Sequence, residues 1–161
     1  MVTLPLYDQR WVARSEEGFR ARSGSLCLPC GANTTCPIRS DNTRTCNVYS
    51  PVIAFKEMTG LNRLSNTFRR GPGWFRRLKP RDRVRLFLSD EEEFLGRSMV
   101  METHVGSLGS LLENHAAMNH TIIDQNAADA ETRLLKVLIK LYGKNYSMPD
   151  QIYSVIYLQP G

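Results

Sequence analysis

The chain has 161 residues, of which 42% are hydrophobic and 23% are charged, and its formal net charge is +5. This length and composition allow one domain with a hydrophobic core of its own and a small appendage beside it. No run of about 18 apolar residues is present, which excludes a membrane-spanning helix. The N-terminus also lacks the basic-then-apolar order of a signal peptide. We therefore expect a cytoplasmic protein that does not bind membranes.

The first region, residues 1–47, is polar and irregular, and it holds all four cysteines of the chain. A C-x-x-C pair brings two thiolates to one ion, and four thiolates complete a tetrahedral zinc site that can fold a segment with no core of its own. We therefore predict a structural zinc knuckle. An iron–sulfur cluster, disulfides and unpaired thiols are the alternatives. The predicted ligands have the spacing C-x2-C-x5-C-x9-C and are Cys27, Cys30, Cys36 and Cys46.

Residues 48–161 have the periodicity of a folded domain with mostly β structure. The apolar run VYSPVIAF, rich in β-branched and aromatic residues, predicts a strand at 48–55. In LKPRDRVRLFLSD a turn is followed by apolar residues at Val84, Leu86 and Leu88, an alternation that predicts a half-buried strand. The same alternation predicts two further strands, in GRSMVMETHVGSL and in QIYSVIYL.

Two helices are expected between the last two strands. Asn126 can cap a helix with Asp129 three positions later, and leucines then recur at helical spacing until Gly143 ends the helix. The segment SLGSLLENHAAM predicts a shorter helix, with its leucines on one face. The fold class expected for residues 48–161 is therefore α+β.

From about residue 50 to the C-terminus, the order of these segments resembles the ASCH family, which is related to the PUA domain. The resemblance lies in the strand PVIAF, the Thr-x-Arg at Thr67–Arg69, the strand entry K-P-x-D-x-V-x-L at 79–86, the strand leading into a small-residue and Leu helix, and the closing strand. It implies a small, partly open β-barrel with flanking helices. It also implies a cleft that faces the Thr-x-Arg segment, and an association with RNA or modified nucleotides.

Enzymes similar to this family carry Gly-x-Lys-Thr ahead of the Thr-x-Arg, and the lysine is thought to act as a base and a threonine as the nucleophile. This chain has Leu64 and Ser65 at the Lys-Thr positions, and Arg63 is the nearest cation. Arginine stays protonated near neutral pH and is a poor base, so the lysine chemistry is not expected here. The candidates that remain for a catalytic role are Thr67, Glu102 and His104.

The net charge conceals a strong asymmetry along the chain. Residues 63–85 carry nine basic side chains and one acidic one, whereas residues 89–131 carry nine acidic side chains and one arginine. Arginine binds phosphate with paired hydrogen bonds, and RRGPGWFRR adds aromatic rings on which bases can stack. Alternatively, the rings pack under the loop and the arginines are solvated or paired with residues 89–93. The predicted nucleic-acid contacts are Arg63, Thr67, Arg69, Arg70, Trp74, Phe75, Arg76, Arg77, Lys79 and Arg81.

Three functions are compatible with these patterns. We favour a non-catalytic module that binds nucleic acid, RNA above all, and reads a flipped or modified base in the cleft of the barrel. The second hypothesis is a hydrolase acting on RNA or a nucleoside, in which Glu102 and His104, which point the same way on a strand, form an acid–base pair. The third is an interaction protein whose basic face docks an acidic protein partner.

Overall fold

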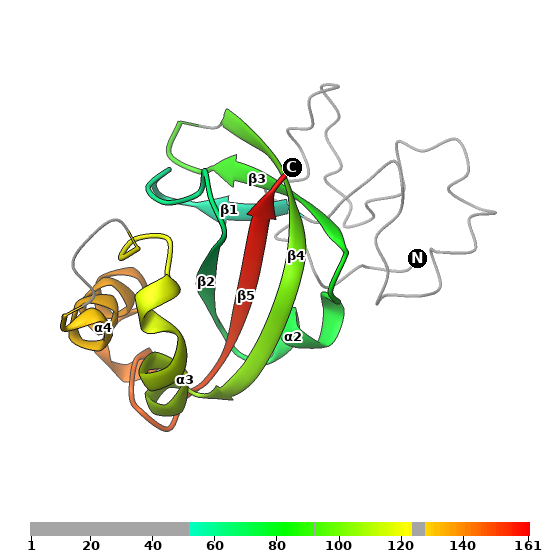
Figure 1. Cartoon of the computed structure of the whole chain (residues 1–161). Coiled ribbons are helices and arrows are strands. Elements are labelled where there is room, and N and C mark those ends of the chain that lie inside the picture. The colour runs from blue at the N-terminus through cyan, green and yellow to red at the C-terminus, as the bar shows by residue number, and fades with distance from the viewer. Residues whose placement is uncertain (1–51, 92, 124–127) are drawn as a thin grey trace, which may run out of the picture.

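The centre of the molecule is one five-stranded sheet that curls into a half-barrel (Figure 1). The computed structural model describes residues 52–91, 93–123 and 128–161, so the four cysteines and the helix cap predicted at Asn126 lie outside the described residues. The strand order is β1-β3-β4-β5-β2, which places β1 and β2 at the two edges. The strands are β1 (Val52–Phe55), β2 (Ser65–Arg70), β3 (Arg83–Leu88), β4 (Glu93–Ser107) and β5 (Ile152–Pro160).

Only one of the four strand pairs is parallel, the pair of β1 and β3. The long strand β4 pairs with β3 in its first half and with β5 along most of its length. Its register with β5 shifts between Val100 and Glu102, which is typical of a β-bulge. Such a shift bends a strand and increases its twist, so β4 can belong to both walls of the half-barrel.

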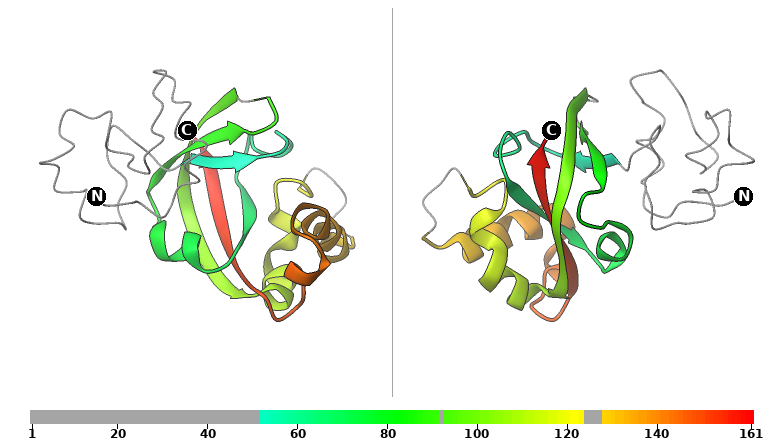
Figure 2. Two further views of the ribbon diagram at one scale, coloured as in Figure 1. Left: turned by 180° about the vertical axis from the view of Figure 1, so that it is seen from behind. Right: turned by 45° about the vertical axis from the view of Figure 1, so that its right-hand side comes forward.

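The two faces of the sheet bury separate hydrophobic clusters. The inner cluster fills the half-barrel, and its buried members are Ile53, Phe55, Leu78, Val84, Leu86, Val100, Ile156 and Leu158. The outer cluster lies between the sheet and two helices, α3 (Leu108–His115) and α4 (Ala130–Tyr142). Figure 2 shows both helices on the same side of the half-barrel. Because both faces are covered, most side chains of β5 are buried.

Short helices complete the connections. The helix α2 (Gly73–Arg77) follows β2 and lies at one end of the half-barrel, where the Ser154 hydroxyl accepts a hydrogen bond from the Phe75 amide at 3.2 Å and donates one to the Gly71 carbonyl at 2.6 Å. Two 3₁₀ turns, η2 (Ala116–Met118) and η3 (Lys144–Tyr146), follow α3 and α4. None of the helices in the described ranges is long and apolar enough to cross a membrane.

The structure confirms the strands predicted in chain order around β1, β3, β4 and β5, and it confirms both helices. The α+β class and the partly open barrel shape agree with the sequence-based expectation. The helix α4 begins at Ala130 after Asp129, whose side chain makes no capping hydrogen bond, and it ends at Gly143 with φ +88°.

Three features differ from the expectation. The strand β2 and the helix α2 were not predicted, because the polar sequence before Arg70 and the Gly-Pro-Gly after it resemble a loop. The strand β3 was predicted to be half-buried, but Arg85 and Phe87 are also buried. This part of the strand is therefore covered on both faces.

A substitution of Gly60 tests how tightly the loop after β1 packs. Gly60 has φ +68°, and a Cβ there would lie 2.2 Å from the His120 carbonyl oxygen. Gly71 has a similar φ of +76° but no atom within 4 Å of a Cβ. We expect Gly71→Ala to lower the free energy of unfolding by about 1 kcal/mol and Gly60→Ala by about 3 kcal/mol or more, as measured by urea titration. Equal losses in the two variants would contradict the close contact.

Candidate functional site

The side chain of Arg69 spans the seam between the two edge strands of the sheet. Its Nη2 donates a hydrogen bond to the Ala54 carbonyl of β1 at 2.7 Å, and its Nε donates one to the Thr67 hydroxyl of β2 at 3.1 Å. The guanidinium carbon lies 4.8 Å from the centre of the Phe55 ring, within the range of a cation–π contact. Burial lowers the pKa of Arg69. We call Thr67, Arg69, Phe55 and His120 the seam site.

No carboxylate among the described residues lies within ion-pair distance of Arg69. A guanidinium has five N–H donors, and the two hydrogen bonds above use two of them. A buried cation without a counter-charge favours anionic or carbonyl groups as ligands, because these supply the missing acceptors. The seam site therefore has the chemistry to bind a phosphate oxygen or the carbonyl edge of a base.

His120 forms the opposite wall of the seam site. Its ring packs edge-to-face on Phe55, with ring centres 5.0 Å apart, and its Nδ1 lies 3.0 Å from the Thr59 carbonyl. A carbonyl can only accept a hydrogen bond, so Nδ1 carries the proton and Nε2 is free to accept. Burial, and to a smaller extent the positive charge of Arg69, lower the pKa of His120 to about 4. His120 is therefore neutral at physiological pH.

The segment that carries His120 is fixed to the edge of β2. The His120 amide donates to the Asn66 carbonyl at 3.0 Å, and Asn119 forms an isolated parallel bridge with Asn66. The Asn66 side chain donates to the His115 carbonyl at 2.8 Å. Since a bridge to a sixth segment covers this edge of the sheet, β2 is not an open edge strand at this point.

The predicted acid–base pair forms, but on the other face of the sheet from Thr67. Glu102 and His104 make a hydrogen bond of 3.1 Å. Residues that are opposite each other on antiparallel strands share a face: Thr67 pairs with Ile156 of the inner cluster, whereas Glu102 pairs with Tyr157, which packs on the outer cluster. The three predicted catalytic candidates are therefore not brought together.

The structure instead adds two residues to the acid–base pair that the sequence did not indicate. The His115 ring of α3 lies 4.3 Å from the His104 ring, and its Nδ1 is 2.9 Å from the Tyr157 hydroxyl. Burial and the neighbouring His104 lower the pKa of His115, and burial raises the pKa of Tyr157. Both contacts join residues more than 10 positions apart, which no local sequence pattern shows.

The aromatic pair of the basic segment is divided between core and surface. Trp74 is half-buried and packs against the inner cluster. Phe75 is also half-buried, and the Lys79 ammonium lies 5.7 Å from the centre of its ring. Trp74 therefore stabilises the attachment of α2 to the barrel, and Phe75 is the ring that lies beside a cation.

Most of the predicted cationic contacts lie at the surface around α2 and the start of β3. Arg76, Arg81 and Arg83 are exposed, and no carboxylate of the described residues lies within ion-pair distance of them. Asp82 is the one acidic residue of this segment, and its carboxylate accepts a hydrogen bond from the Lys79 amide at 2.8 Å. Asp82 thus closes the turn before β3 instead of pairing with an arginine. The other predicted contacts at the surface are Arg63, Arg70 and Lys79.

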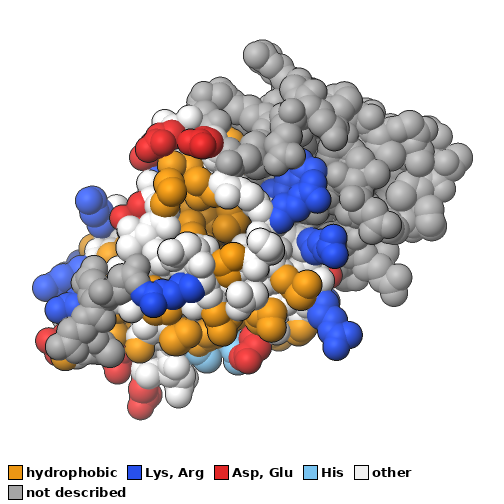
Figure 3. All heavy atoms as spheres, turned by 45° about the horizontal axis from the view of Figure 1, so that its top comes forward, with side chains coloured by type: hydrophobic (Ala, Val, Ile, Leu, Met, Phe, Trp, Pro, Cys, Tyr) orange, Lys and Arg blue, Asp and Glu red, His pale blue; other side chains and the backbone are white. Residues whose placement is uncertain are grey.

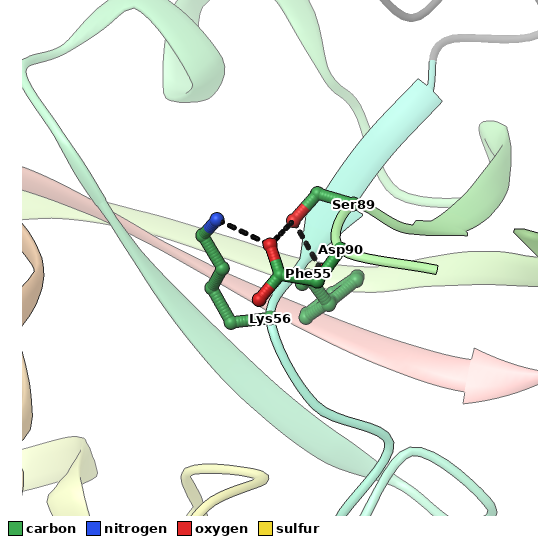
Figure 4. Close-up of polar contacts among 4 residues, drawn as sticks. All are labelled: Phe55, Lys56, Ser89 and Asp90. Carbon is green, nitrogen blue, oxygen red and sulfur yellow. Dashed lines mark hydrogen bonds and ion pairs between the residues drawn. The ribbon is translucent and has the colours of Figure 1, made fainter. Parts of the chain in front are cut away.

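The acidic segment begins at the far end of β3. The Asp90 carboxylate accepts a hydrogen bond from the Lys56 ammonium at 2.7 Å, and the Ser89 hydroxyl donates one to the Phe55 carbonyl at 3.0 Å (Figure 4). Lys56 lowers the pKa of Asp90. Figure 3 shows one group of acidic side chains at the upper edge of this face, with further acidic side chains along its lower edge and groups of Lys and Arg side chains elsewhere on it.

A metal site is not apparent in the part of the chain that the structure describes. No group of three or more His, Cys, Asp or Glu side chains is arranged there to hold an ion. The predicted zinc ligands, Cys27, Cys30, Cys36 and Cys46, lie outside the described residues, so the zinc knuckle stays a prediction.

Comparisons of the chain with protein-family models, with curated protein sequences and with solved structures gave no match.

The pKa of His120 predicts a pH-dependent stability. An unfolded histidine has a pKa of about 6.5, so between pH 6.5 and pH 4 the unfolded chain binds a proton that folded His120 does not. The free energy of unfolding should therefore fall by up to about 3 kcal/mol as the pH is lowered through this range. His120→Gln keeps a donor for the Thr59 carbonyl but cannot titrate, so its stability should depend less on pH. Urea titrations at pH 7, 5.5 and 4 measure the difference, and parallel curves for the two proteins would contradict it.

Proposed function

We propose that this chain is a nucleic-acid-binding module that favours RNA. The exposed cations around α2 and the start of β3 hold the phosphate backbone, and Arg69 binds a base carbonyl or a phosphate at the seam site. The observation that carries the proposal is the separation of the basic surface from Asp90, Glu91 and Glu93, which lie at the far end of β3.

That separation results from the strand between them. Arg83 and Leu88 are the ends of β3, and six extended residues span about 17 Å. This exceeds the Debye length of about 8 Å at physiological ionic strength. Salt therefore screens most of the interaction between exposed charges at the two ends of β3. Asp90 is paired with Lys56 at its own end. The arginines at the other end therefore keep a positive potential that attracts a polyanion.

The seam site supports the same ligand class. The Arg69 guanidinium between two strands offers hydrogen-bond donors to a phosphate or a base carbonyl, while the buried Phe55 and His120 rings beside it hold it in position. The resemblance to the ASCH family points to the same class of ligand through the Thr67–Arg69 segment. The donors of the seam site and the sequence resemblance thus both favour a nucleic acid over an acidic protein.

The proposal is tested by titrating labelled single-stranded RNA, single-stranded DNA and duplex with the protein at several salt concentrations. Arg76→Ala/Arg83→Ala removes two exposed cations, so the slope of log K against log salt for single strands should decrease in magnitude by about 1.4. The control is Lys56→Glu, which changes the net charge by the same two units but lies at the far end of β3, beside Asp90. We expect the control to bind like the wild type, and equal losses in both variants would show a general charge effect instead.

The same titration separates the stacking role from the structural role of the aromatic pair. Phe75→Leu should weaken single-stranded RNA binding by roughly 1–3 kcal/mol if a base stacks on the ring, without lowering stability by a similar amount. Trp74→Ala should lower the free energy of unfolding, because Trp74 packs on the inner cluster.

Polyglutamate that competes as well as RNA would favour an acidic protein partner over the proposed ligand.

A hydrolase is the second candidate, and the adjacency of the His104 and His115 rings favours it. Two imidazoles held by Glu102 and Tyr157 are suited to general acid–base chemistry. A binding module should leave the RNA intact on a denaturing gel after the titration. Cleavage that disappears in His104→Ala and in His115→Ala would replace the proposal with the enzyme.

We also propose that the four cysteines bind structural zinc. Purified protein should contain one zinc per chain by elemental analysis, and Cys27→Ser/Cys30→Ser should lose it. The absence of zinc together with iron and a visible absorbance would point to an iron–sulfur cluster instead.

A further inference from the structure

The helix α4 carries a second group of cations that the charge pattern of the sequence does not emphasise. Arg133, Lys136 and Lys140 follow one another at helical spacings of three and four, so they share one face, and Lys144 follows in η3. Lys136, Lys140 and Lys144 are exposed, and no carboxylate of the described residues lies within ion-pair distance of them. The nearest acidic residues in sequence lie outside this stretch, at Glu131 and Asp150.

Arg70 connects the η3 end of this group, at Lys144, to the basic segment around α2. It is the last residue of β2, and only Gly71 and Pro72 separate it from α2. Its guanidinium carbon lies 3.8 Å from the centre of the Tyr146 ring, which belongs to η3 and follows Lys144 by two positions. In Figures 1 and 2 the end of β2 lies between α2 on one side and the helices α3 and α4 on the other.

The stacking of Arg70 on Tyr146 suits phosphate binding. A guanidinium that lies on a ring uses its flat face for that contact and keeps its N–H groups, which lie in its plane, for a phosphate. No described residue accepts a hydrogen bond from Arg70. Tyr146 is itself held in place, because its carbonyl accepts a hydrogen bond of 2.7 Å from the buried Tyr153 hydroxyl. The backbone that carries the ring is therefore fixed, while the Tyr146 side chain itself is exposed.

We propose that α4, η3 and Arg70 form the second half of the nucleic-acid interface, so that one strand runs from the α2 segment across Arg70 to Lys140 and Lys144. This inference rests on the proposed function and extends its footprint to the opposite side of β2. The ligand is a single strand, because its flexible backbone can follow cations that lie on different elements of the fold. A short oligonucleotide reaches only one half, whereas a longer one reaches both.

The test compares two lengths of labelled single-stranded RNA, about 5 and about 16 nucleotides, in a salt series. Lys140→Glu/Lys144→Glu should weaken binding of the longer RNA at least tenfold and lower its salt slope by about 1.4, with little effect on the shorter one. The control, Lys56→Glu, reverses an exposed cation at the far end of β3, away from the proposed interface, and it should bind both lengths like the wild type. Thermal unfolding of each variant verifies that α4 remains folded.

A second pair of variants tests the stacked arginine. Tyr146→Leu should weaken binding of the longer RNA severalfold, because Arg70 loses its ring, and Tyr146→Phe should retain wild-type binding. Unchanged binding in Lys140→Glu/Lys144→Glu, while Arg76→Ala/Arg83→Ala lowers it, would overturn the inference and leave the proposed function intact. No binding by the wild type would overturn both. The variants are also mixed with anionic lipid vesicles. If Lys140→Glu/Lys144→Glu lost binding to the vesicles but bound RNA like the wild type, α4 would be assigned to a membrane surface instead.

Discussion

The hydrogen bond from Arg69 to the Ala54 carbonyl joins the two edges of the sheet, and the arrangement of the rest of the structure depends on it. The strands β1 and β2 lie at opposite ends of the strand order and share no backbone ladder, so side chains hold these two edges together. An apolar residue in place of Arg69 could fill space but could not satisfy a strand carbonyl at this distance. The inner cluster beneath the seam is enclosed because this one side chain reaches across.

A second layer of contacts supports the closure from outside. The chain after α3 returns to the edge of β2 through Asn119 and His120, and Gly60 lets the loop after β1 approach His120 more closely than any side chain would permit. The closure thus depends on three segments that are far apart in the sequence. A cation is stable in this place since a strand carbonyl, a hydroxyl and an aromatic face surround it, even though no carboxylate among the described residues neutralises it.

The sequence predicted those parts of the fold that have either apolar residues at the period of the element or a continuous apolar run. This applies to α4, whose leucines recur at helical spacing, and to β5, whose apolar run is bounded by turns. The sequence did not predict β2. Its residues Asn66 and Thr67 are polar but buried, with their side chains hydrogen-bonded, so the strand has no periodic apolar signal. Of the candidate site, the pairing of Glu102 with His104 followed from the period of two along a strand. The positions of His115 and His120 depend on tertiary contacts and could not be predicted.

The number of arginines between residues 63 and 85 does not by itself define a binding surface, because some of them are buried. Arg69 is used to close the barrel, and Arg85 is buried with an Nε that has no partner among the described residues. Arg76 and Arg83 are exposed. Local sequence does not distinguish these fates. Arg83 and Arg85 are two positions apart on β3 and lie on the same face, yet Arg83 is exposed and Arg85 is buried by residues from elsewhere in the chain. The potential available to a ligand therefore comes from fewer cations than the sequence contains, and it is maintained because β3 keeps the acidic segment at its other end.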